Sequence, residues 1–386
     1  MAKNIPQKTF RVGLFFEQYS IPYPEKVGLG IIKIARRMGN WRFYMEGGLP
    51  FLSSRKMKWE GDGIITDSPD IENLRKYLSI ENTPVITISD ARENSPCHQV
   101  TNDDHSIGRM GAKHLMQTPE RSFGFLRWGN FAFTHAREQG FAEELKKNGL
   151  SYSVLEIQQQ SRHHSIQSIK KWLHSTKFPA AIMATTDDVA IFFMQICETL
   201  GVDVPRQVSV LGVNNIPLIC EMFTPTLSSI QRNGEDIGIE AAKLLHRLMN
   251  GENLDYQSIK IPPVSVIQRA STSFMYSDNL EVDEAMRYIH NHANQPIAVP
   301  DVVNAVNITR RTLENRFRKH LNSSIYDKIR LAHVKYACNM LIETNIAVSR
   351  IAHESGFNDK GRLYSSFNKL MKMTPEQYRK KNTLKK

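Results

Sequence analysis

Two similar helix-turn-helix patterns stand in tandem in the last 86 residues of this chain. In each pattern, a short helix with periodic apolar residues is followed by a tight turn and a second helix. The inward face of the second helix is set by a Leu and a Phe four residues apart. These pairs are Leu313 with Phe317 and Leu363 with Phe367, so the two patterns are offset by 50 residues. Two such units can place recognition helices in successive major grooves, whose centres lie about 34 Å apart. The pattern predicts an all-α, DNA-binding C-terminal domain.

The distribution of charge supports this prediction. Residues 301 to 386 contain 18 Lys and Arg against 7 Asp and Glu, a net charge of +11 that equals the net charge of the whole 386-residue chain. The rest of the chain is therefore neutral on balance. A basic segment joined to a neutral one is typical of a nucleic-acid-binding module attached to a domain with another task.

Helix spacing indicates which residues face DNA. Thr309 suits the N-cap of the first recognition helix, and Leu321 joins Leu313 and Phe317 on the core side. We expect Arg311 to contact guanine, because a guanidinium can bond O6 and N7 together. Residues 325 to 342 are predicted to form a long helix that joins the two units. The predicted DNA-binding residues are Arg310, Arg311, Thr312, Asn315 and Arg318 in the first unit and Lys360, Arg362 and Ser365 in the second, where Ser366 is also expected to be exposed.

The neutral part of the chain alternates between strand and helix patterns. Short apolar runs bounded by turn residues predict buried parallel strands, and amphipathic segments between them predict helices, which together indicate βαβ architecture. The expected strands are Phe10–Phe16, Gly63–Thr66, Val85–Ile88, Phe123–Leu126, Ala181–Ala184 and Val208–Val213. The expected helices are Val27–Met38, Ile71–Leu78, Ser106–Met116, Ala136–Asn148, Ile166–Leu173, Val189–Leu200 and Ile237–Met249.

Polar residues recur just after the carboxyl ends of these strands, where open parallel sheets bind ligands. Carboxylates, amides, a guanidinium and aromatic rings at one edge suit a polyhydroxylated ligand, because polar groups pair with its hydroxyls while rings stack on its apolar faces. At any single position, a role as a helix N-cap explains an Asp or Asn as well as ligand binding does. The predicted ligand-binding residues are Glu17, Trp128, Arg137, Asp187, Asn214 and Asn215.

Several other classes of function are disfavoured. The first expected strand is not followed by a Gly-rich dinucleotide motif, and no phosphate-binding loop motif occurs, so no nucleotide cofactor is expected. The four cysteines are scattered in apolar stretches and are expected to be buried free thiols, with no metal site.

A sugar-acting enzyme is the main alternative, but Asp187 and Asp188 are adjacent at a helix start and point in different directions, so no catalytic residues are predicted. An unregulated chromosome-associated protein leaves the long α/β segment unexplained. No apolar run is long enough to span a membrane and no signal region begins the chain, which favours the cytoplasm.

Two stretches of the chain resemble known families. Residues 8 to 272 resemble the two-lobed, periplasmic-binding-protein-like sensor of the LacI family in their order of elements and in Ala136–Phe141, Thr186–Asp188 and Leu211–Asn215. Residues 278 to 384 resemble the AraC-type DNA-binding domain, on Ile351-Ala352, Gly356-Phe357, Phe367 and the terminal Thr374-Pro375 with Tyr378-Arg379. A sensor followed by an AraC-type reader is the arrangement of bacterial xylose operon regulators.

The resemblance implies a function. It implies a sugar sensor with parallel sheets and an all-α reader, acting as an activator of pentose utilisation that binds a monosaccharide and promoter DNA. A homodimer and contact with RNA polymerase are expected partners. A regulator of the same architecture that answers another sugar, or that represses, is the alternative. Asn214 stands where the family commonly has Asp, and because Asn donates as well as accepts, the hydroxyl pattern it recognises can differ.

Overall fold

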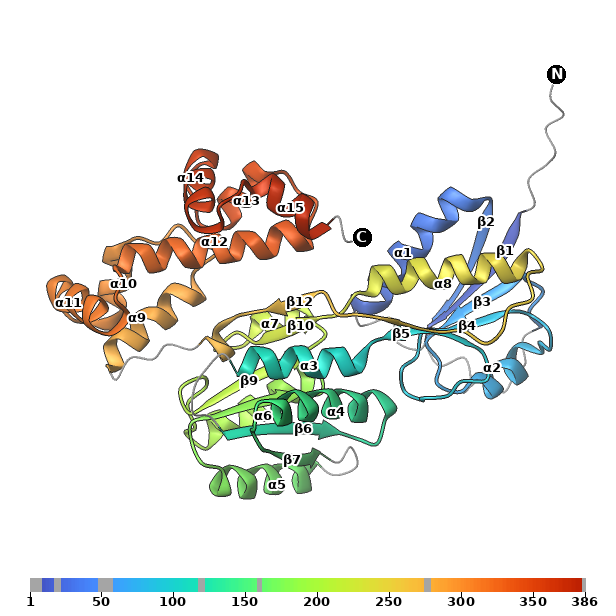
Figure 1. Cartoon of the computed structure of the whole chain (residues 1–386), viewed down its shortest axis with the longest axis horizontal. Coiled ribbons are helices and arrows are strands. Elements are labelled where there is room, and N and C mark those ends of the chain that lie inside the picture. Colours follow the sequence, from blue (N-terminus) through green and yellow to red (C-terminus); the bar gives the residue numbers. More distant parts are fainter. Residues whose placement is uncertain are drawn as a thin grey trace.

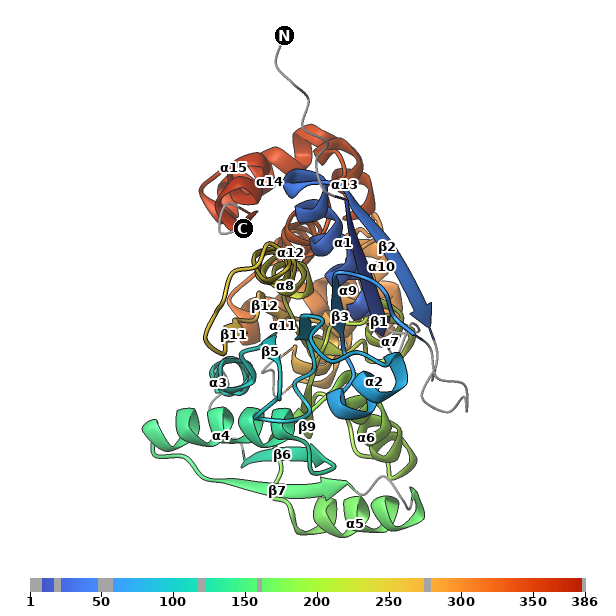
Figure 2. The ribbon, with the colours of Figure 1, turned by 90° about the vertical axis from the view of Figure 1, so that its right-hand side faces the viewer.

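The computed structural model describes residues 9–16, 22–47, 58–116, 122–157, 162–273 and 279–383. Two α/β lobes make up the larger part of the molecule, and a bundle of helices at the C-terminal end packs beside one of them (Figure 1). Each lobe is built on a six-stranded sheet flanked by helices, which confirms the predicted α/β class. A view at right angles shows the helical bundle and the second lobe at opposite ends of the picture (Figure 2).

The first lobe contains a sheet of strand order β11-β5-β4-β3-β1-β2 in which every pair is parallel. Its strands are largely apolar at the centre, and Val12, Ile65 and Ile86 are buried in one core with the helices α1 and α8. The elements of this lobe are β1 (Phe10–Phe16), α1 (Pro22–Met38), β2 (Trp41–Gly47), β3 (Gly63–Thr66), α2 (Ile71–Leu78), β4 (Val85–Thr87), β5 (His98–Asn102), α8 (Gly234–Met249) and β11 (Ser258–Ile261).

The second lobe contains a sheet of order β12-β10-β9-β8-β6-β7, in which only β12 runs antiparallel to its neighbour. The strand β8 is fully buried and lies at the centre of the sheet. The elements of this lobe are α3 (Asp104–Leu115), β6 (Ser122–Trp128), α4 (Ala132–Lys147), β7 (Tyr152–Ile157), α5 (Arg162–Ser175), β8 (Ala180–Ala184), α6 (Asp187–Thr199), β9 (Val208–Val213), α7 (Pro217–Met222), β10 (Ser228–Gln231), β12 (Ser265–Ile267) and the 3-10 turn η2 (Ala270–Thr272).

The chain crosses between the lobes three times, after β5, after β10 and between β11 and β12. The crossings are joined to one another, since the amide of Asp103 donates to the carbonyl of Ile261 (2.8 Å) and that of Val264 donates to Gln231 (2.9 Å). Three linked segments form a hinge that allows two lobes to close on a ligand without separating.

Close helix pairs in both lobes depend on glycine. In the first lobe, a Cβ on Gly30 of α1 would overlap the backbone carbonyl of Glu235, and one on Gly238 of α8 would overlap that of Val27. In the second lobe, Gly108 of α3 and Gly140 of α4 have the same reciprocal relation to the opposite helix. No side chain fits at these crossings, so the backbones of the paired helices touch.

All the predicted strands and helices of the sensor exist, and β1, β3, β9 and α2 have the predicted bounds. Sequence patterns missed six strands: β2, β5, β7, β10, β11 and β12. Each is short, polar or at a sheet edge, such as the all-buried β10 with sequence Ser-Ser-Ile-Gln. Their backbones are held by pairing with distant strands, which local hydrophobicity does not record.

The C-terminal bundle contains two small cores that share one long helix. The first half of α12 (Ile325–Glu343) supplies Ile325 and Ile329 to a core with Leu313 and Phe317, and its second half supplies Val334 and Leu341 to a separate core. The other helices are α9 (Leu280–Asn291), α10 (Val299–Val306), α11 (Arg310–Leu321), α13 (Val348–Glu354), α14 (Lys360–Met371) and α15 (Pro375–Thr383). The predicted connecting helix is therefore confirmed.

Candidate functional site

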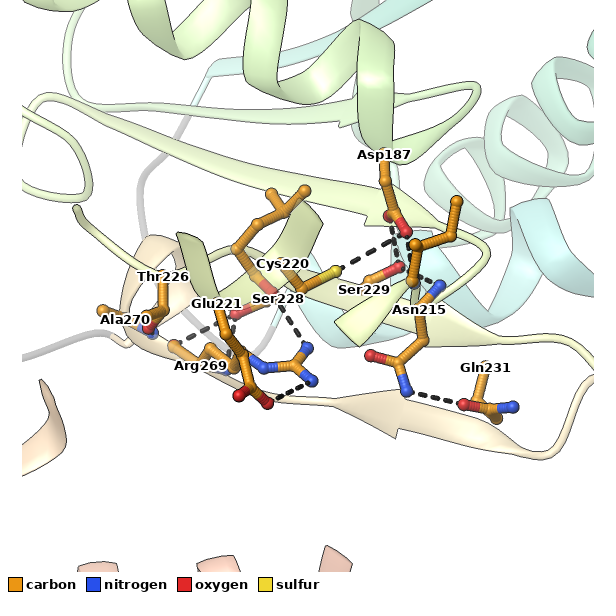
Figure 3. A network of polar contacts seen from close by, with 12 residues as sticks. Asp187, Asn215, Cys220, Glu221, Thr226, Ser228, Ser229, Gln231, Arg269 and Ala270 are labelled. Carbon is orange, nitrogen blue, oxygen red and sulfur yellow. Dashed lines mark hydrogen bonds and ion pairs between the residues drawn. The ribbon is translucent and has the colours of Figure 1, made fainter. Parts of the chain in front are cut away.

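A buried network of polar contacts surrounds Asp187 at the start of α6 (Figure 3). The hydroxyl of Ser229 donates to Oδ1 of Asp187 (2.5 Å), and the amide of Ile216 and the thiol of Cys220 donate to Oδ2 (2.9 and 3.5 Å). The Asp187 side chain is fully buried. It ties the ends of β8, β9 and β10 together, so it orients the strand-end loops around it.

Burial raises the pKa of Asp187 to about 6, and the hydrogen bond from Ser229 acts in the opposite direction. An exposed Asp titrates near 3.9. The folded chain therefore holds this proton more tightly than the unfolded chain does, and Asp187 makes the protein less stable as the pH rises from about 4 to about 6.

Replacing Asp187 by Asn is expected to remove this part of the pH dependence. The difference in free energy of unfolding, variant minus unaltered protein, should increase by at most about 3 kcal/mol between pH 4 and pH 7. Denaturant unfolding at several pH values, followed by Trp fluorescence, measures the difference. Parallel pH profiles for the two proteins would contradict the assignment.

Arg137 on α4 is buried and fully engaged by groups of the second lobe. Its Nε and Nη2 lie 2.8 Å from Oδ1 of Asp104, and its Nη1 donates to the carbonyl of Thr185 (2.5 Å). The guanidinium carbon lies 4.8 Å from the centre of the Phe133 ring. Only 1% of Arg137 is exposed. The residue therefore braces the start of α3, the start of α4 and the end of β8 against one another.

Two consecutive residues after β9 have positive φ angles. Asn214 has φ 122° and Asn215 has φ 50°. The first value lies in a region that residues with a side chain rarely adopt, and such strain gathers at functional sites. Asn214 donates its amide to Ile230 (3.0 Å), while Asn215 donates from its amide to Ser229 (2.9 Å) and from its side chain to Gln231 (2.6 Å).

Trp128 lies at the end of β6 and is half-buried. It lines a cavity of about 500 Å³ together with Asp188, Ser165 and apolar residues of α6 and α7. Its ring packs against Phe131 (centroids 5.7 Å apart), which stacks in turn on Phe133. This aromatic cluster reaches Arg137, so Trp128 lies on the same side of the lobe as the polar network.

The structure thus brings Arg137, Asp187 and Asn215 into one connected region, with Asn214 adjacent in sequence and Trp128 reached through the aromatic cluster. The sixth predicted residue, Glu17, lies outside the described residues.

Sequence reasoning missed Asp104 and Asp90, which follow β5 and β4 in the first lobe. Asp90 accepts from the side chain of Asn102 (2.8 Å) at the first crossing. The signal for Asp104 was the pair Asp103-Asp104 directly after β5, a strand too polar to be recognised.

Desolvation raises the pKa of the Asp104 carboxyl, and the adjoining Arg137 guanidinium counters this effect. A carboxylate is stable in a buried position only when it is paired. The Arg137 and Asp104 side chains are therefore mutually dependent.

In the helical bundle, α11 and α14 present the predicted DNA-binding residues to solvent. Thr309 caps α11 by accepting from the amide of Thr312 (3.3 Å), and Asp359 caps α14 by accepting from that of Arg362 (2.8 Å). The following predicted residues are exposed: Arg310, Arg311, Asn315, Arg318, Lys360, Arg362 and Ser365; Thr312 is half-buried.

Some of these cations are already paired within the chain. Arg310 contacts Glu314 (2.8 Å) and Arg362 contacts Asp359 (3.5 Å), both as exposed pairs that DNA phosphates can displace. Arg316, by contrast, bridges from α11 to Glu281 on α9 (2.6 Å). Arg316 therefore fixes the recognition helix to the bundle.

The expectation that Ser366 is exposed was wrong, since only 8% of its surface is accessible. It lies one turn after Leu363 and next to Phe367, so it belongs to the apolar face of α14. In the backbone turn before α11, Asn307 adopts the left-handed conformation with φ 54°, which Asn enters more easily than most residues.

Comparisons with known proteins cover nearly the whole chain. The xylose operon regulatory protein of Escherichia coli K12 is 30% identical over 389 aligned residues, which cover 97% of this chain and 98% of the relative. The chain belongs to the xylose operon regulatory protein family. The family's regulator in Haemophilus influenzae is 28% identical, with 97% and 99% of the two chains covered.

Family models and structures agree with this assignment. A periplasmic binding protein-like domain matches residues 112–272 and a helix-turn-helix domain matches residues 302–381. A solved xylose-binding transcription activator aligns with a TM-score of 0.69 at 28% identity and covers 97% of this chain and 99% of its own. A ribose-bound LacI family regulator from Enterococcus faecium, 20% identical with a TM-score of 0.54, covers 69% of this chain and 100% of its own and shares the sensor fold.

As a member of this regulator family, the chain carries a sugar-sensor fold and a DNA-binding module. The four cysteines, Cys97, Cys197, Cys220 and Cys338, are buried and free, as predicted. Within the described ranges, no cluster of three or more His, Cys, Asp or Glu residues is arranged to hold a metal ion. In that same part of the chain, none of the helices has the length and apolar character needed to span a membrane.

Proposed function

We propose that this protein is a cytoplasmic activator of xylose utilisation genes that binds xylose in a sensor spanning residues 8–272 and promoter DNA through a reader spanning residues 278–384. The observation that carries the proposal is the end-to-end relation to a xylose operon regulatory protein, in which sensor and reader match in the same order. The two-lobed fold with three hinge segments supports ligand closure. A catalytic role is not proposed.

The geometry supports two kinds of role at the sugar site. Asn214, Asn215 and Trp128 are proposed to contact the sugar, since the strained Asn pair and the half-buried indole lie at strand ends. Arg137 and Asp187 are proposed to hold these loops in place and to offer a polar edge to the ligand, because their side chains already bond to protein groups. Glu17 is proposed as a ligand from the first lobe on its sequence position alone.

A panel of sugars tests the identity of the effector. Xylose is expected to increase the free energy of unfolding of the sensor by RT ln(1 + [L]/Kd) and so to raise its melting temperature, while ribose, arabinose and hexoses at equal concentration give a smaller rise. All four Trp residues lie before residue 273, so Trp fluorescence reports on the sensor alone. If the sensor responds to another sugar and not to xylose, the proposed architecture still holds and that other sugar is the effector.

Arg311→Ala tests the reader. The substitution is expected to weaken binding to the cognate promoter site by about 1–3 kcal/mol and to relax discrimination at one base pair. Lys360→Ala is the matched comparison, because loss of a phosphate contact should weaken binding to all sequences and lower the salt dependence. Gel mobility-shift assays with single-base variants of the site distinguish a base contact from a phosphate contact. Equal effects on all sequences would make Arg311 a phosphate contact.

The proposed assembly is a homodimer that recruits RNA polymerase at the promoter. Each chain contains two recognition helices on α11 and α14, so a dimer offers four, which suits two repeated half-sites. Repression of the same genes is the alternative outcome. A reporter gene under the promoter, with and without xylose, separates activation from repression.

A further inference from the structure

A second cavity, of about 200 Å³, lies at the junction between the sensor and the helical bundle. Its walls come from both parts of the chain, since the sensor supplies residues at and after the ends of α7 and β12, and the bundle supplies residues of α12 and of the end of α9. The polar residues in these walls include Glu221, Arg269, His290, Asn291, Lys335 and Asn339. The junction is also tied by Arg287 on α9, whose Nη1 lies 3.6 Å from a carboxylate oxygen of Asp203 in the sensor.

Basic groups outnumber acidic ones around this cavity. Among the described lining residues, Glu221 is the one carboxylate, and it already contacts Arg269 at 3.5 Å. Lys335 makes no ion pair within the described part of the chain. Partial desolvation and the nearby Lys328 lower the pKa of Lys335, and burial together with Lys335 lowers the pKa of His290. Arg269 is matched by Glu221, so Lys335 is the cation at this cavity that has no counter-charge among the described residues.

Hydrogen-bonding groups at the cavity are also incompletely used. The buried Oδ1 of Asn291 has no hydrogen-bond partner among the described residues. Rotation of this amide can present its nitrogen instead of its oxygen, so it can serve as a donor. Nδ1 of His290 donates to the carbonyl of Met286 (2.9 Å), so Nε2 of the neutral ring is an acceptor and His290 adds no donor to the cavity. Lys335, Asn291 and Asn339 thus supply donors from two helices.

The size of the cavity limits what can bind. Pockets for drug-sized ligands have volumes of roughly 300–1,000 Å³, and a water molecule takes up about 30 Å³ in the liquid. A volume of about 200 Å³ is too small for a nucleotide and larger than a single water needs. A compact ligand with several acceptor oxygens and negative charge matches both the volume and the donors.

We propose that this junction cavity is a second ligand site, distinct from the sugar site, that binds a small oxyanion carrying a phosphate or carboxylate group. Lys335 supplies the counter-charge, and Asn291 and Asn339 supply hydrogen bonds from the bundle side. Because Arg269 and Glu221 line the sensor side, a bound anion holds the two parts of the chain against each other.

The site is connected to the network around Asp187. Ser228 accepts from the amide of Arg269 (2.7 Å) and donates to its carbonyl (3.0 Å), and the next residue, Ser229, bonds to Asp187. Figure 3 shows Arg269 and Glu221 at one end of this network and Asp187 at the other. An anion that fixes Arg269 is therefore expected to restrain the strand-end loops as well.

The test titrates the full-length protein, without sugar, with inorganic phosphate, succinate or chloride at constant ionic strength and pH. Phosphate, succinate or both should give saturable binding in calorimetry and a rise in melting temperature, whereas chloride should give neither. The anion that binds more tightly identifies the headgroup. Lys335→Met should lower the affinity at least about tenfold, because a hydrogen bond to a charged group is lost.

Two further variants make the result specific. Asn339→Leu keeps the charge and removes a donor, so it should also weaken binding. Lys171→Met removes an exposed Lys on α5, away from the cavity, and should bind as the unaltered protein does. The proposal is overturned if neither anion binds, if chloride acts equally, or if Lys335→Met and Asn339→Leu both fold, by circular dichroism, and retain full affinity. These titrations contain no sugar. A failure of sugar binding in a separate experiment would therefore contradict the proposed function and leave the anion site unaffected.

Discussion

Replacing Arg137 by Leu is expected to lower the free energy of unfolding of the sensor by about 3–5 kcal/mol, because it leaves the buried Asp104 carboxylate without its cation. The Thr185 carbonyl loses a donor at the same time. Urea unfolding followed by Trp fluorescence measures the sensor alone. Sugar response should be lost together with stability, because Arg137 positions the loops at three strand ends.

A double substitution separates the two effects. Arg137→Leu with Asp104→Leu removes both charges, and it should recover much of the stability lost in the single variant. Sugar binding should stay absent in the double variant if Arg137 also contacts the ligand. An Arg137→Leu protein with unchanged stability would show that the buried Arg137–Asp104 pair does not form in solution.

Gly30→Ala and Gly28→Ala are expected to change stability in opposite directions, although the two glycines lie two residues apart on α1. The new methyl group at position 30 meets the backbone of α8, so the helices must separate at a cost of about 3 kcal/mol. At position 28 nothing lies within 4 Å, so alanine adds helix propensity and should stabilise by about 0.5–1 kcal/mol. Thermal unfolding of both variants gives the comparison. Similar destabilisation in both would mean that α1 disfavours alanine for a reason other than contact with α8.

The elements with their own hydrophobic pattern were predictable, and those that depend on distant partners were not. The strand β9 is apolar except for Ser209 and was placed correctly, whereas β5 and β10 have the composition of polar segments. Both lie inside sheets, where Gln99 and Ser229 are buried by neighbouring strands and helices. A single sequence does not encode which strands these polar runs pair with.

The reader was easier to predict than the sugar site. Its recognition helices follow from local spacing, because Leu313, Phe317, Leu363 and Phe367 mark the buried faces and the exposed residues follow by elimination. The single error, Ser366, arose because a small polar residue was assigned by its chemistry instead of its position on the helix. At the candidate sugar site, the strand-end pattern places Asp187 just after β8, whereas Arg137 lies inside α4. The pattern did not reveal that Asp104 and Ser229 already occupy the polar atoms of these two side chains.

The reciprocal glycine crossing of α1 and α8 joins segments that leave the ribosome far apart in time. About 200 residues separate the end of α1 from the start of α8. At about 5–20 residues per second, synthesis of that interval takes roughly 10–40 s. During that time the second lobe is being made while the first lobe lacks both α8 and its edge strand β11. The glycine-lined face of α1 and the open edge of β5 are then exposed on the nascent chain. We therefore expect the cellular yield of folded regulator to depend on elongation rate and chaperone supply, even where the finished protein is stable.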